Sequence, residues 1–449
     1  MKYLLLLFLF LLSILGIKAQ SNLRENYHYS KLDNGLEVLI ISDYSVPLIN
    51  LEIAFRGGGI VEPPDLDGIS HLYEHMIFNA TEGYPTAKLF NDKMLELGII
   101  MNAGTDQEIV NYYFTLPAEN WTEGMGLFAQ GILKPLFLEQ ELEKERLIVN
   151  DEFQRAESDP SFLIDRETDK KLWGDLFSRK NVIGDHDVIL SASKDQLELL
   201  RSKYYHPNNA IMIVSGAINF SEALDQIKIN FNDWKPSDYE PLGKNIIPDF
   251  KPLTKSEKFI IEDENSEESL LLYAWHGPDT RNDLKSVFAA EMFFNMLSLQ
   301  NLGFQQNLVE SGLAYETDSW STSSKYVSSM YLEIYPNEKK ITKTLASIEK
   351  EIDQWATPGY FSEKDLETAK NLFIINDAYD QEELSEYIHF IAGIWASADI
   401  DIAMSLQDKI QKVTMDDINN FINKYIVNKP RTVGIIIPPS LRKKIGSFE

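Results

Sequence analysis

The stretch HLYEH, residues 71–75, holds two of the seven histidines of the chain, four residues apart, with a glutamate directly before the second. On a helix, positions i and i+4 lie on one face, so His71 and His75 can present their imidazoles to one ion, with Glu74 projecting close to the same point. Two neutral nitrogen ligands and a carboxylate able to accept a proton from a metal-bound water are what zinc-dependent hydrolysis requires. The pattern HxxEH is the inverted form of HExxH.

A third ligand is predicted on the segment 138–156, LEQELEKERLIVNDEFQRA, which has the spacing of a helix. The inward stripe of this helix consists of Leu138, Leu142, Glu145, Val149, Glu152 and Ala156. A buried carboxylate needs a cation or strong hydrogen-bond donors. We therefore predict Glu152 as the third zinc ligand, which leaves the fourth position for water, and Glu145 as a group that holds a ligand in place.

Two simpler interpretations stay open for these residues. His71 and His75 can be two exposed histidines of an ordinary helix, and the stripe on 138–156 can be misphased by one residue. The other five histidines lack ligand-like spacing and are interpreted as surface residues or as histidines with satisfied hydrogen bonds: His28, His186, His206, His276 and His389.

The first residues predict an exported protein. Lys2 is followed by the apolar run YLLLLFLFLLSILG and then by IKAQ, where the small Ala19 can precede a cleavage point. The run is shorter than the roughly 20 residues that a membrane helix needs. Residues 1–19 are therefore predicted to be a signal peptide, and the mature chain to lie in the periplasm or the medium without a membrane span. An uncleaved membrane anchor is the alternative.

The charge of the chain is strongly acidic, with 42 basic and 69 acidic residues and a formal net charge of −27. Such a field repels nucleic acid and anionic membranes, so neither is expected as a partner, and it attracts cationic ligands such as basic peptides. A role in solubility alone is an equally good explanation. The chain contains no cysteine, so its stability must come from its core.

Three pairs of segments repeat at a nearly constant offset, which indicates two copies of one domain. The matching segments are AFRGGG (54–59) with AWHGPD (274–279), EHMIFN (74–79) with AEMFFN (290–295), and KYYHPNNAIMIV (203–214) with KYIVNKPRTVGI (424–435). We therefore predict an N-terminal domain at 20–233 and a C-terminal domain at 257–449, joined by a linker at 234–256 that is rich in proline.

Each copy mixes strand-like runs with longer helical stretches, which is typical of an α+β fold rather than of repeated βαβ units. In the second copy, Val287, Ala290 and Glu291 stand in place of His71, Glu74 and His75. The second domain is therefore predicted to be inactive.

HxxEH, followed by 76 intervening residues and Glu152, resembles the zinc signature of the pitrilysin family of metallopeptidases. That family includes insulin-degrading enzyme and the mitochondrial processing peptidase. The segments GGGIVEPPDLDGISHLYEHMIFN and EKERLIVNDEF are also similar to the runs that lead into the family's ligands, and the resemblance covers essentially the whole mature chain. It implies two homologous α/β-roll domains, each an antiparallel sheet covered by helices, with the second domain inert.

The resemblance also implies a role for each residue of the site. One zinc ion per chain would be held by His71, His75 and Glu152, and Glu74 would be the general base that deprotonates the attacking water. The segment 101–114, MNAGTDQEIVNYYF, resembles the edge strand to which a peptide substrate adds.

Further residues are implied on both sides of the cleft. Asn102 and Ala103 match the strand residues next to the metal, and Tyr315 matches a tyrosine that hydrogen-bonds the tetrahedral oxyanion. The arginine expected seven residues before that tyrosine is absent, because Leu308 stands there. Some family members work as pairs of related chains, one with zinc and the other with the arginine and tyrosine. We therefore expect a heterodimer with a homologous chain, or otherwise a homodimer.

The sequence thus favours an exported zinc endopeptidase that acts on peptides or small unfolded proteins. A non-catalytic partner or assembly subunit of the same family is the first alternative, and the intact Glu74 and Glu152 argue against it. A zinc hydrolase with non-peptide substrates is the second, and the strand-binding edge argues against that one.

Overall fold

The computed structural model describes residues 26–174, 179, 181–240, 242, 247, 251–446 and 448. The predicted signal peptide, 1–19, lies outside the described residues, as does part of the predicted linker at 234–256. None of the described helices is both long enough and apolar enough to cross a bilayer.

The first half of the chain forms a six-stranded sheet in the order β1-β2-β6-β3-β5-β4. The strands are β1 (Tyr27–Lys31), β2 (Glu37–Ser42), β3 (Leu48–Arg56), β4 (Ile100–Thr105), β5 (Ile109–Pro117) and β6 (Ala210–Gly216). Neighbours are antiparallel except β2 and β6, which run parallel. β6, with sequence AIMIVSG, is buried along its whole length, as an apolar run in the middle of a sheet should be, whereas β4 lies at the edge.

Helices cover one face of this sheet, and their apolar sides join its largest buried cluster. These helices are α2 (Ile69–Ile77), α3 (Ala87–Glu96), α4 (Trp121–Leu133), α5 (Glu139–Glu157), α7 (His186–Ser191), α8 (Lys194–Tyr204) and α9 (Phe220–Phe231). Short 3-10 turns lie at Gly59–Val61, Pro64–Leu66, Ala118–Asn120 and Pro207–Asn209. A capping box between Ser193 and Gln196 fixes the start of α8.

The second half repeats this arrangement in a five-stranded sheet. Its strands are β7 (Glu257–Glu262), β8 (Leu270–His276), β9 (Ala314–Ser321), β10 (Ser329–Pro336) and β11 (Thr432–Ile437). The order β7-β11-β8-β10-β9 matches β2-β6-β3-β5-β4 of the first sheet, including one parallel pair, β7 with β11. The predicted α+β fold of two repeated domains is therefore confirmed, with the refinement that each sheet contains one parallel strand pair.

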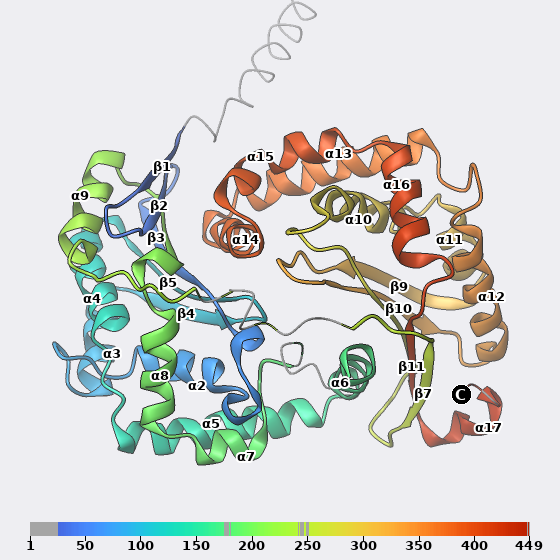
Figure 1. Ribbon diagram of the computed structural model, residues 1–449, viewed down its shortest axis with the longest axis horizontal. Helices are drawn as coiled ribbons and strands as arrows, with labels where there is room; N and C mark the ends of the chain where they lie inside the picture. Colours follow the sequence, from blue (N-terminus) through green and yellow to red (C-terminus); the bar gives the residue numbers. More distant parts are fainter. Residues whose placement is uncertain are drawn as a thin grey trace, which may run out of the picture.

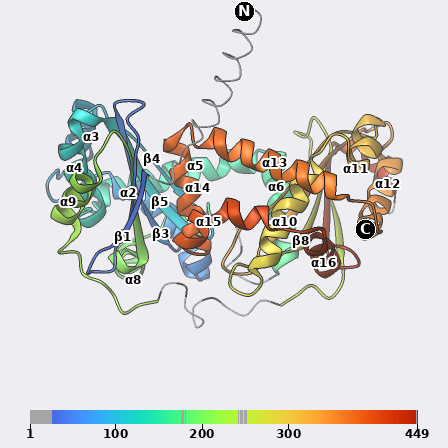
Figure 2. The same cartoon turned by 90° about the horizontal axis from the view of Figure 1, so that it is seen from above.

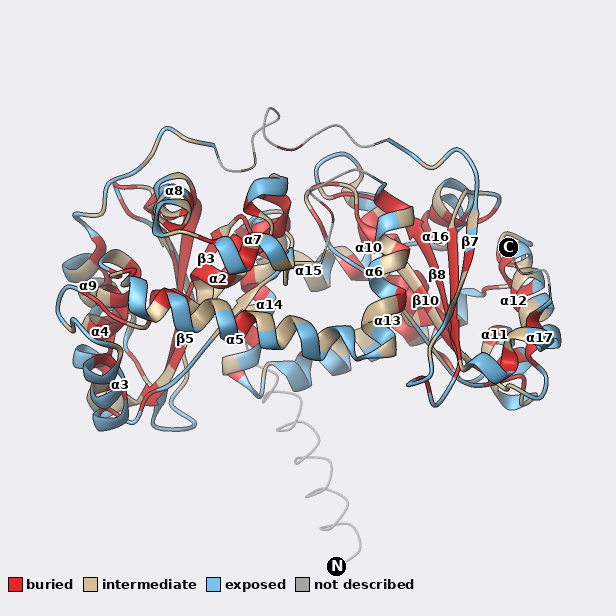
Figure 3. Cartoon of the chain, turned by 90° about the horizontal axis from the view of Figure 1, so that it is seen from below, coloured by how far each residue is buried: buried red, intermediate tan, exposed pale blue. Residues whose placement is uncertain are grey.

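Helices also cover the second sheet, and Figure 3 shows the central strands of both sheets as largely buried. The α-helices are α10 (Leu284–Leu297), α11 (Gly303–Gln305), α12 (Ile341–Gln354), α13 (Glu363–Asp380), α15 (Ile400–Gln411), α16 (Met415–Phe421) and α17 (Arg442–Ile445). Two π-helical segments, η6 (Gln306–Glu310) and η7 (Ile422–Ile426), and a 3-10 turn at Pro439–Leu441 complete the half.

Each half contributes one helix that packs on the sheet of the other half. α6 (Pro160–Trp173) follows α5 in the sequence but packs on β8 and β11 of the second sheet, and α14 (Leu384–Ser397) packs on β3, β5 and β6 of the first. Figures 1 and 2 show both helices between the two sheets. Ile164 of α6 and Ile391 of α14 are almost completely buried in the resulting apolar clusters. The two halves therefore share their cores.

A buried polar contact also joins the two halves. Glu108, in the turn between β4 and β5, accepts a hydrogen bond of 2.8 Å from Nη2 of Arg179. It also accepts from the backbone N–H groups of Lys325 (2.6 Å) and Tyr326 (3.1 Å), in the turn between β9 and β10. The tips of the two hairpins are therefore held together by one carboxylate.

Candidate metal centre

Gly68 and Glu62 fix the start of α2, the helix that carries both histidines. Gly68 precedes α2 with a φ of 92°, and a Cβ there would come within 2.7 Å of the Cα of Gly184, so glycine is required. The buried carboxylate of Glu62 accepts the backbone N–H groups of Gly68 (2.9 Å) and Ser70 (2.5 Å). It thereby satisfies two of the unpaired N–H groups at the start of α2 and complements the positive end of its dipole.

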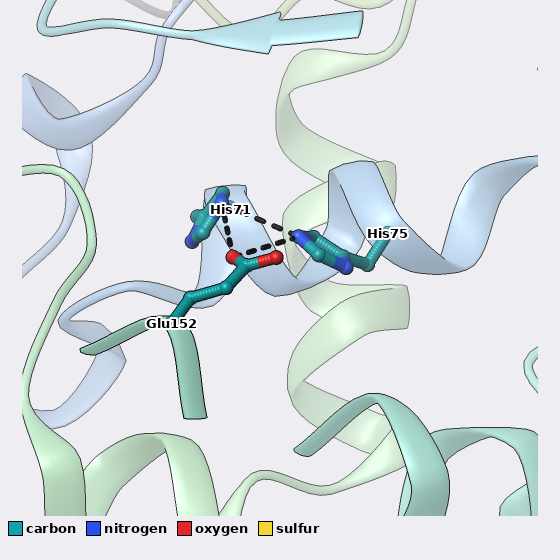
Figure 4. A group of neighbouring side chains, drawn as sticks. All are labelled: His71, His75 and Glu152. Carbon is teal, nitrogen blue, oxygen red and sulfur yellow. Dashed lines mark hydrogen bonds and ion pairs between the residues drawn. The ribbon is translucent and has the colours of Figure 1, made fainter. Parts of the chain in front are cut away.

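The three predicted ligand atoms lie close together (Figure 4). Nε2 of His71 and Nε2 of His75 are 3.3 Å apart. Oε2 of Glu152 lies 3.7 Å from Nε2 of His71 and 3.5 Å from Nε2 of His75. The histidines come from α2 and the glutamate from α5, which packs against it. Among the described residues, these three form the group with ligand geometry suited to a metal ion.

These separations fit a zinc ion. Zinc with nitrogen and oxygen ligands at about 2.0–2.2 Å in tetrahedral geometry places neighbouring ligand atoms about 3.3–3.6 Å apart. The two Nε2 atoms face each other at 3.3 Å, with the carboxylate of Glu152 beside them. Unprotonated nitrogens and a carboxylate all carry lone pairs, so a proton or a cation must lie among the three atoms. Burial, with a smaller contribution from His75, lowers the pKa of His71 to about 4, which favours the neutral ring that binds metal.

Glu145 contacts His75 from the side opposite Glu152. Oε2 of Glu145 lies 3.1 Å from Nδ1 of His75, and Oε1 accepts a hydrogen bond of 3.1 Å from Nδ2 of Asn79. Burial acts to raise the pKa of Glu145, but the bonds to His75 and Asn79 outweigh it and lower the pKa. A proton on Nδ1 of His75 leaves Nε2 free to bind the ion, which is the arrangement that an outer carboxylate produces in zinc sites.

The two carboxylates next to His75 also act on its charge. Burial acts to lower the pKa of His75, but the hydrogen bond to Glu145 and the charge of Glu152 outweigh it and raise the pKa. The negative charge gathered around the imidazoles is therefore of the kind that a divalent cation would neutralise.

Glu74 points from α2 toward the edge strand β4. Oγ1 of Thr105, the last residue of β4, donates a hydrogen bond of 2.5 Å to its Oε2. Burial raises the pKa of Glu74, while the bond from Thr105 acts in the opposite direction. A carboxylate with a raised pKa beside a metal position suits a general base, because its pKa lies nearer to neutrality.

The predicted substrate strand lies at the edge of the first sheet. β4 pairs with β5 on one side, with Asn102 opposite Tyr113 and Ala103 opposite Tyr112, and no described strand lies on its other side. Asn102 is exposed, and its Oδ1 accepts the backbone N–H of Ala103. The edge is thus open for an added strand, and it ends at the residue that holds Glu74.

Comparison with known families identifies the chain. Residues 37–177, which include both histidines, Glu74 and Glu152, match the family described as insulinase, peptidase family M16, and residues 191–373 match the peptidase M16 inactive domain. The chain belongs to the M16 family of peptidases.

Relatives of this M16 chain are named as zinc proteases. An uncharacterized zinc protease of Rickettsia felis is 25% identical over 425 residues, covering 94% of this chain and 100% of that protein. The uncharacterized zinc protease YmxG of Bacillus subtilis is 26% identical over 304 residues, which are 67% of this chain and 71% of that one.

Solved structures share the fold of this M16 chain. A protease from Helicobacter pylori superposes with a TM-score of 0.81 at 18% identity, over 92% of this chain and 99% of that one. The first half of the periplasmic protease PqqL from Escherichia coli gives a TM-score of 0.75 at 19% identity, over 94% of each chain. Against complete PqqL the match covers 94% of this chain but 48% of the other, so this chain corresponds to half of PqqL.

In the second M16 domain, the two positions expected to act across the cleft differ in exposure. Tyr315, on the edge strand β9, is 60% exposed and makes no hydrogen bond or ion pair with the described residues of the metal centre. Leu308 is fully buried in the core of the second half, so an arginine at that position could not reach the cleft without rearrangement of this segment.

Three residues around the centre were not predicted from the sequence. Glu62 holds the start of α2, Thr105 holds Glu74, and Asn79 holds Glu145. A signal existed for Asn79, because the repeat places Asn295 at the matching position, and for Glu62, an acidic residue shortly before the start of a helix. No periodic pattern marks Thr105.

Two of the other histidines, His389 and His276, take part in contacts between the halves. Nδ1 of His389, on α14, lies 2.7 Å from Oε2 of the fully buried Glu52, and Nε2 of His276 lies 2.8 Å from the carbonyl oxygen of Leu172. Burial lowers the pKa of His276 to about 4. The first contact joins α14 to β3 of the first sheet, and the second joins α6 to β8 of the second sheet.

Proposed function

We propose that this M16 chain is a zinc-dependent endopeptidase that hydrolyses peptides or small unfolded proteins, with one zinc ion held by His71, His75 and Glu152. The observation that carries the proposal is the convergence of three ligand atoms at separations of 3.3, 3.5 and 3.7 Å, with the carboxylate of Glu74 on the same helix face. Relatives named as zinc proteases support it.

The residues of the site divide the chemistry between them. Zinc, when bound, would polarise the scissile carbonyl and make the attacking water more acidic. Glu74 would accept a proton from that water and later pass it to the leaving amine, while Thr105 keeps its carboxylate oriented. Glu145 would hold the ring of His75 in the orientation that presents Nε2.

The substrate would bind as an added strand on β4. Backbone pairing at the open edge is largely independent of side chains, so a peptide lying past Asn102 and Ala103 would be fixed mainly by its main chain. Selectivity would then come from the space between the halves and from the acidic charge, which favours basic peptides at low ionic strength.

We also propose that the protein is exported and acts in the periplasm or outside the cell. The basic and apolar start of the chain, with Ala19 before a cleavage point, supports a signal peptide. The structural neighbour PqqL from Escherichia coli, a periplasmic protease, supports the same compartment.

A homologous chain is proposed as the partner that completes the site, with a homodimer as the alternative. Leu308 occupies the place of the expected arginine, so this chain alone lacks one of the two groups implied for the oxyanion. The other group, Tyr315, is present and exposed. The correspondence with half of PqqL also supports assembly with a second two-domain unit.

The test is zinc content together with peptide cleavage for the mature chain, alone and with a co-expressed homologous chain. The variant Glu74→Gln should keep its zinc and lose cleavage, whereas Glu82→Gln, on an exposed turn after α2, should match the unaltered chain. Activity that appears only with the second chain would support the heterodimer, and equal activity without it would refute that part of the proposal.

Two other results would favour the alternatives. Zinc bound at one per chain without cleavage in either setting would indicate a non-catalytic subunit of the family. Hydrolysis of simple esters or amides, with no cleavage in a peptide library, would indicate a hydrolase of non-peptide substrates. Absence of zinc from a folded chain would refute the metal centre itself.

A further inference from the structure

The second half contains a structural counterpart of the metal centre, built from different side chains. α10 and α13 pack together as α2 and α5 do in the first half. Nδ2 of Asn295 donates to the carbonyl oxygen of Glu291 at 2.8 Å, as Nδ2 of Asn79 donates to that of His75 at 3.1 Å. The helix geometry has therefore been kept, while the ligands have been replaced.

A cavity of about 100 Å³ lies at this counterpart. Its wall is formed by residues of α10, α13 and α15 of the second half and of α14, which packs on the first sheet, and Figure 2 shows these helices near one another. Apart from Glu291, its wall is mostly apolar and includes Val287, Phe288, Phe373, Ile394, Ile402 and Leu406. Phe373 comes from α13, which packs on α10 as α5, the helix of Glu152, packs on α2.

Among the described residues that line this cavity, Glu291 is the one carboxylate. Its Oε1 accepts a hydrogen bond of 2.9 Å from Nδ2 of Asn295, and within the described part of the chain its second oxygen has no partner. Burial raises the pKa of Glu291, yet the residue keeps a partly accessible surface. A group that is surrounded by protein but still accessible lies on the wall of an internal space, so the second oxygen is available to an occupant.

The cavity adjoins a larger space, which gives it a route of access. Ser323, Phe390 and Ile394 line both the small cavity and one of about 460 Å³ between the halves. The two spaces therefore share part of their walls, and a small molecule or the end of a peptide that binds at Glu291 would enter from the larger one.

We propose that this cavity binds an apolar group of about four carbon atoms that carries one primary ammonium, with the ammonium donating to Glu291 and the apolar part lying against Val287 and Phe373. The size follows from comparison with an apolar cavity of about 150 Å³, which holds benzene. A metal ion does not fit, because one carboxylate without imidazoles cannot replace the three ligands of a zinc site. The same chemistry belongs to a free alkylamine and to the amino-terminal residue of a peptide with a leucine-like side chain, whose carbonyl and following residues would have to lie outside this cavity, toward the larger space that shares Ser323, Phe390 and Ile394.

The experiment is a titration of the zinc-loaded mature chain, followed by NMR of isoleucine methyl groups, among which Ile394 and Ile402 report on the cavity. The probes are isobutylamine, isobutanol as its uncharged isostere, and leucinamide as the peptide-terminus form. We expect isobutylamine or leucinamide to shift these methyl signals, and isobutanol to bind about tenfold more weakly, because it lacks the charge-assisted hydrogen bond. Which amine binds more tightly distinguishes the free amine from the peptide terminus.

Variants separate the cavity from the metal centre, which can itself bind amines. Glu291→Gln keeps the shape of the side chain and should weaken amine binding about tenfold or more, to the level of isobutanol. Glu333→Gln removes another carboxyl whose pKa burial raises, but one on β10 that does not line the cavity, and should bind as the unaltered chain does.

Three results would overturn the proposal. The first is the absence of shifts at Ile394 and Ile402, the second is equal binding of amine and alcohol to the unaltered chain, and the third is amine binding that persists in Glu291→Gln. The comparison of amine with alcohol uses only the unaltered chain, so it tests the proposal even if Glu291→Gln does not fold. None of these readouts depends on peptide cleavage, so failure of this proposal and failure of the peptidase proposal are distinguishable.

Discussion

Glu145→Gln should weaken zinc binding without altering any of the three ligands. The carboxylate of Glu145 accepts on both sides, from Nδ1 of His75 and from Nδ2 of Asn79, each at 3.1 Å. A glutamine amide offers one oxygen and one NH₂ group, so one of the two donors would face another donor. The site would lose one charge-assisted hydrogen bond at a side chain that is 15% exposed, which costs about 1.5–3 kcal/mol, or roughly a 10- to 100-fold rise in the Kd for zinc.

The affinity is measured by competition with a chromophoric zinc chelator at neutral pH. Glu143→Gln is the matched control, because it lies on the exposed side of the same helix, α5, and should change the Kd by less than about twofold. A second background tests the cause. In Asn79→Ala the donor conflict disappears, so adding Glu145→Gln should have a smaller effect than it has in the unaltered chain.

Two outcomes would refute this reasoning. If Glu145→Gln and Glu143→Gln bind zinc equally well, the carboxylate does not support His75. If Glu145→Gln weakens zinc binding by the same factor in the unaltered chain and in Asn79→Ala, the donor conflict is not the cause. In either case, circular dichroism should first show that the variants keep the helix content of the unaltered chain.

Three further predictions follow from individual contacts. Thr105→Val removes the hydrogen bond to Glu74 and should slow peptide hydrolysis about tenfold with zinc content unchanged, which a cleavage assay with metal analysis checks. Glu108→Ala leaves Arg179 buried without its counter-ion and should lower the free energy of unfolding in urea by about 3–5 kcal/mol, whereas the exposed Glu119→Ala should not. Burial raises the pKa of Asp169 to about 6, so the native state favours its protonated form, and stability falls as the pH rises from about 4 to 6. Asp169→Asn should therefore gain up to about 3 kcal/mol relative to the unaltered chain at pH 8 and almost nothing at pH 4; an equal gain at both pH values would contradict this.

The helical part of the metal centre was predictable because it depends on periodicity within single segments. The spacing of His71 and His75 places both rings on one side of α2 wherever that helix lies. On α5 the predicted stripe is borne out, since Leu142 and Val149 are fully buried and Glu145 and Glu152 are partly buried. Two apolar residues on the same face as two glutamates were enough to orient the helix.

Contacts that arise from tertiary packing could not be predicted in the same way. Thr105 meets Glu74 because β4 ends beside α2, and that position depends on strand pairing across the whole sheet. The start of α6 was visible in Asp159 and Pro160, a cap followed by proline at the first turn. Its sequence does not indicate that it packs on the sheet of the other half. Apolar periodicity shows that a helix face is buried, but not which surface buries it.

The exchange of helices gives the inactive half a physical reason to be retained. α14 covers β3, β5 and β6 with side chains such as Ile391 and Trp395, and the guanidinium of Arg56 on β3 lies 3.8 Å from the centre of the Trp395 ring. Each such apolar side chain contributes about 1.5–3 kcal/mol through burial, so the first sheet without this helix would lose a large part of its stability and expose an apolar face. Val287, Ala290 and Glu291, which stand in place of His71, Glu74 and His75, take no part in these contacts. Selection on the fold of the first half would therefore preserve the second half independently of any chemistry in it.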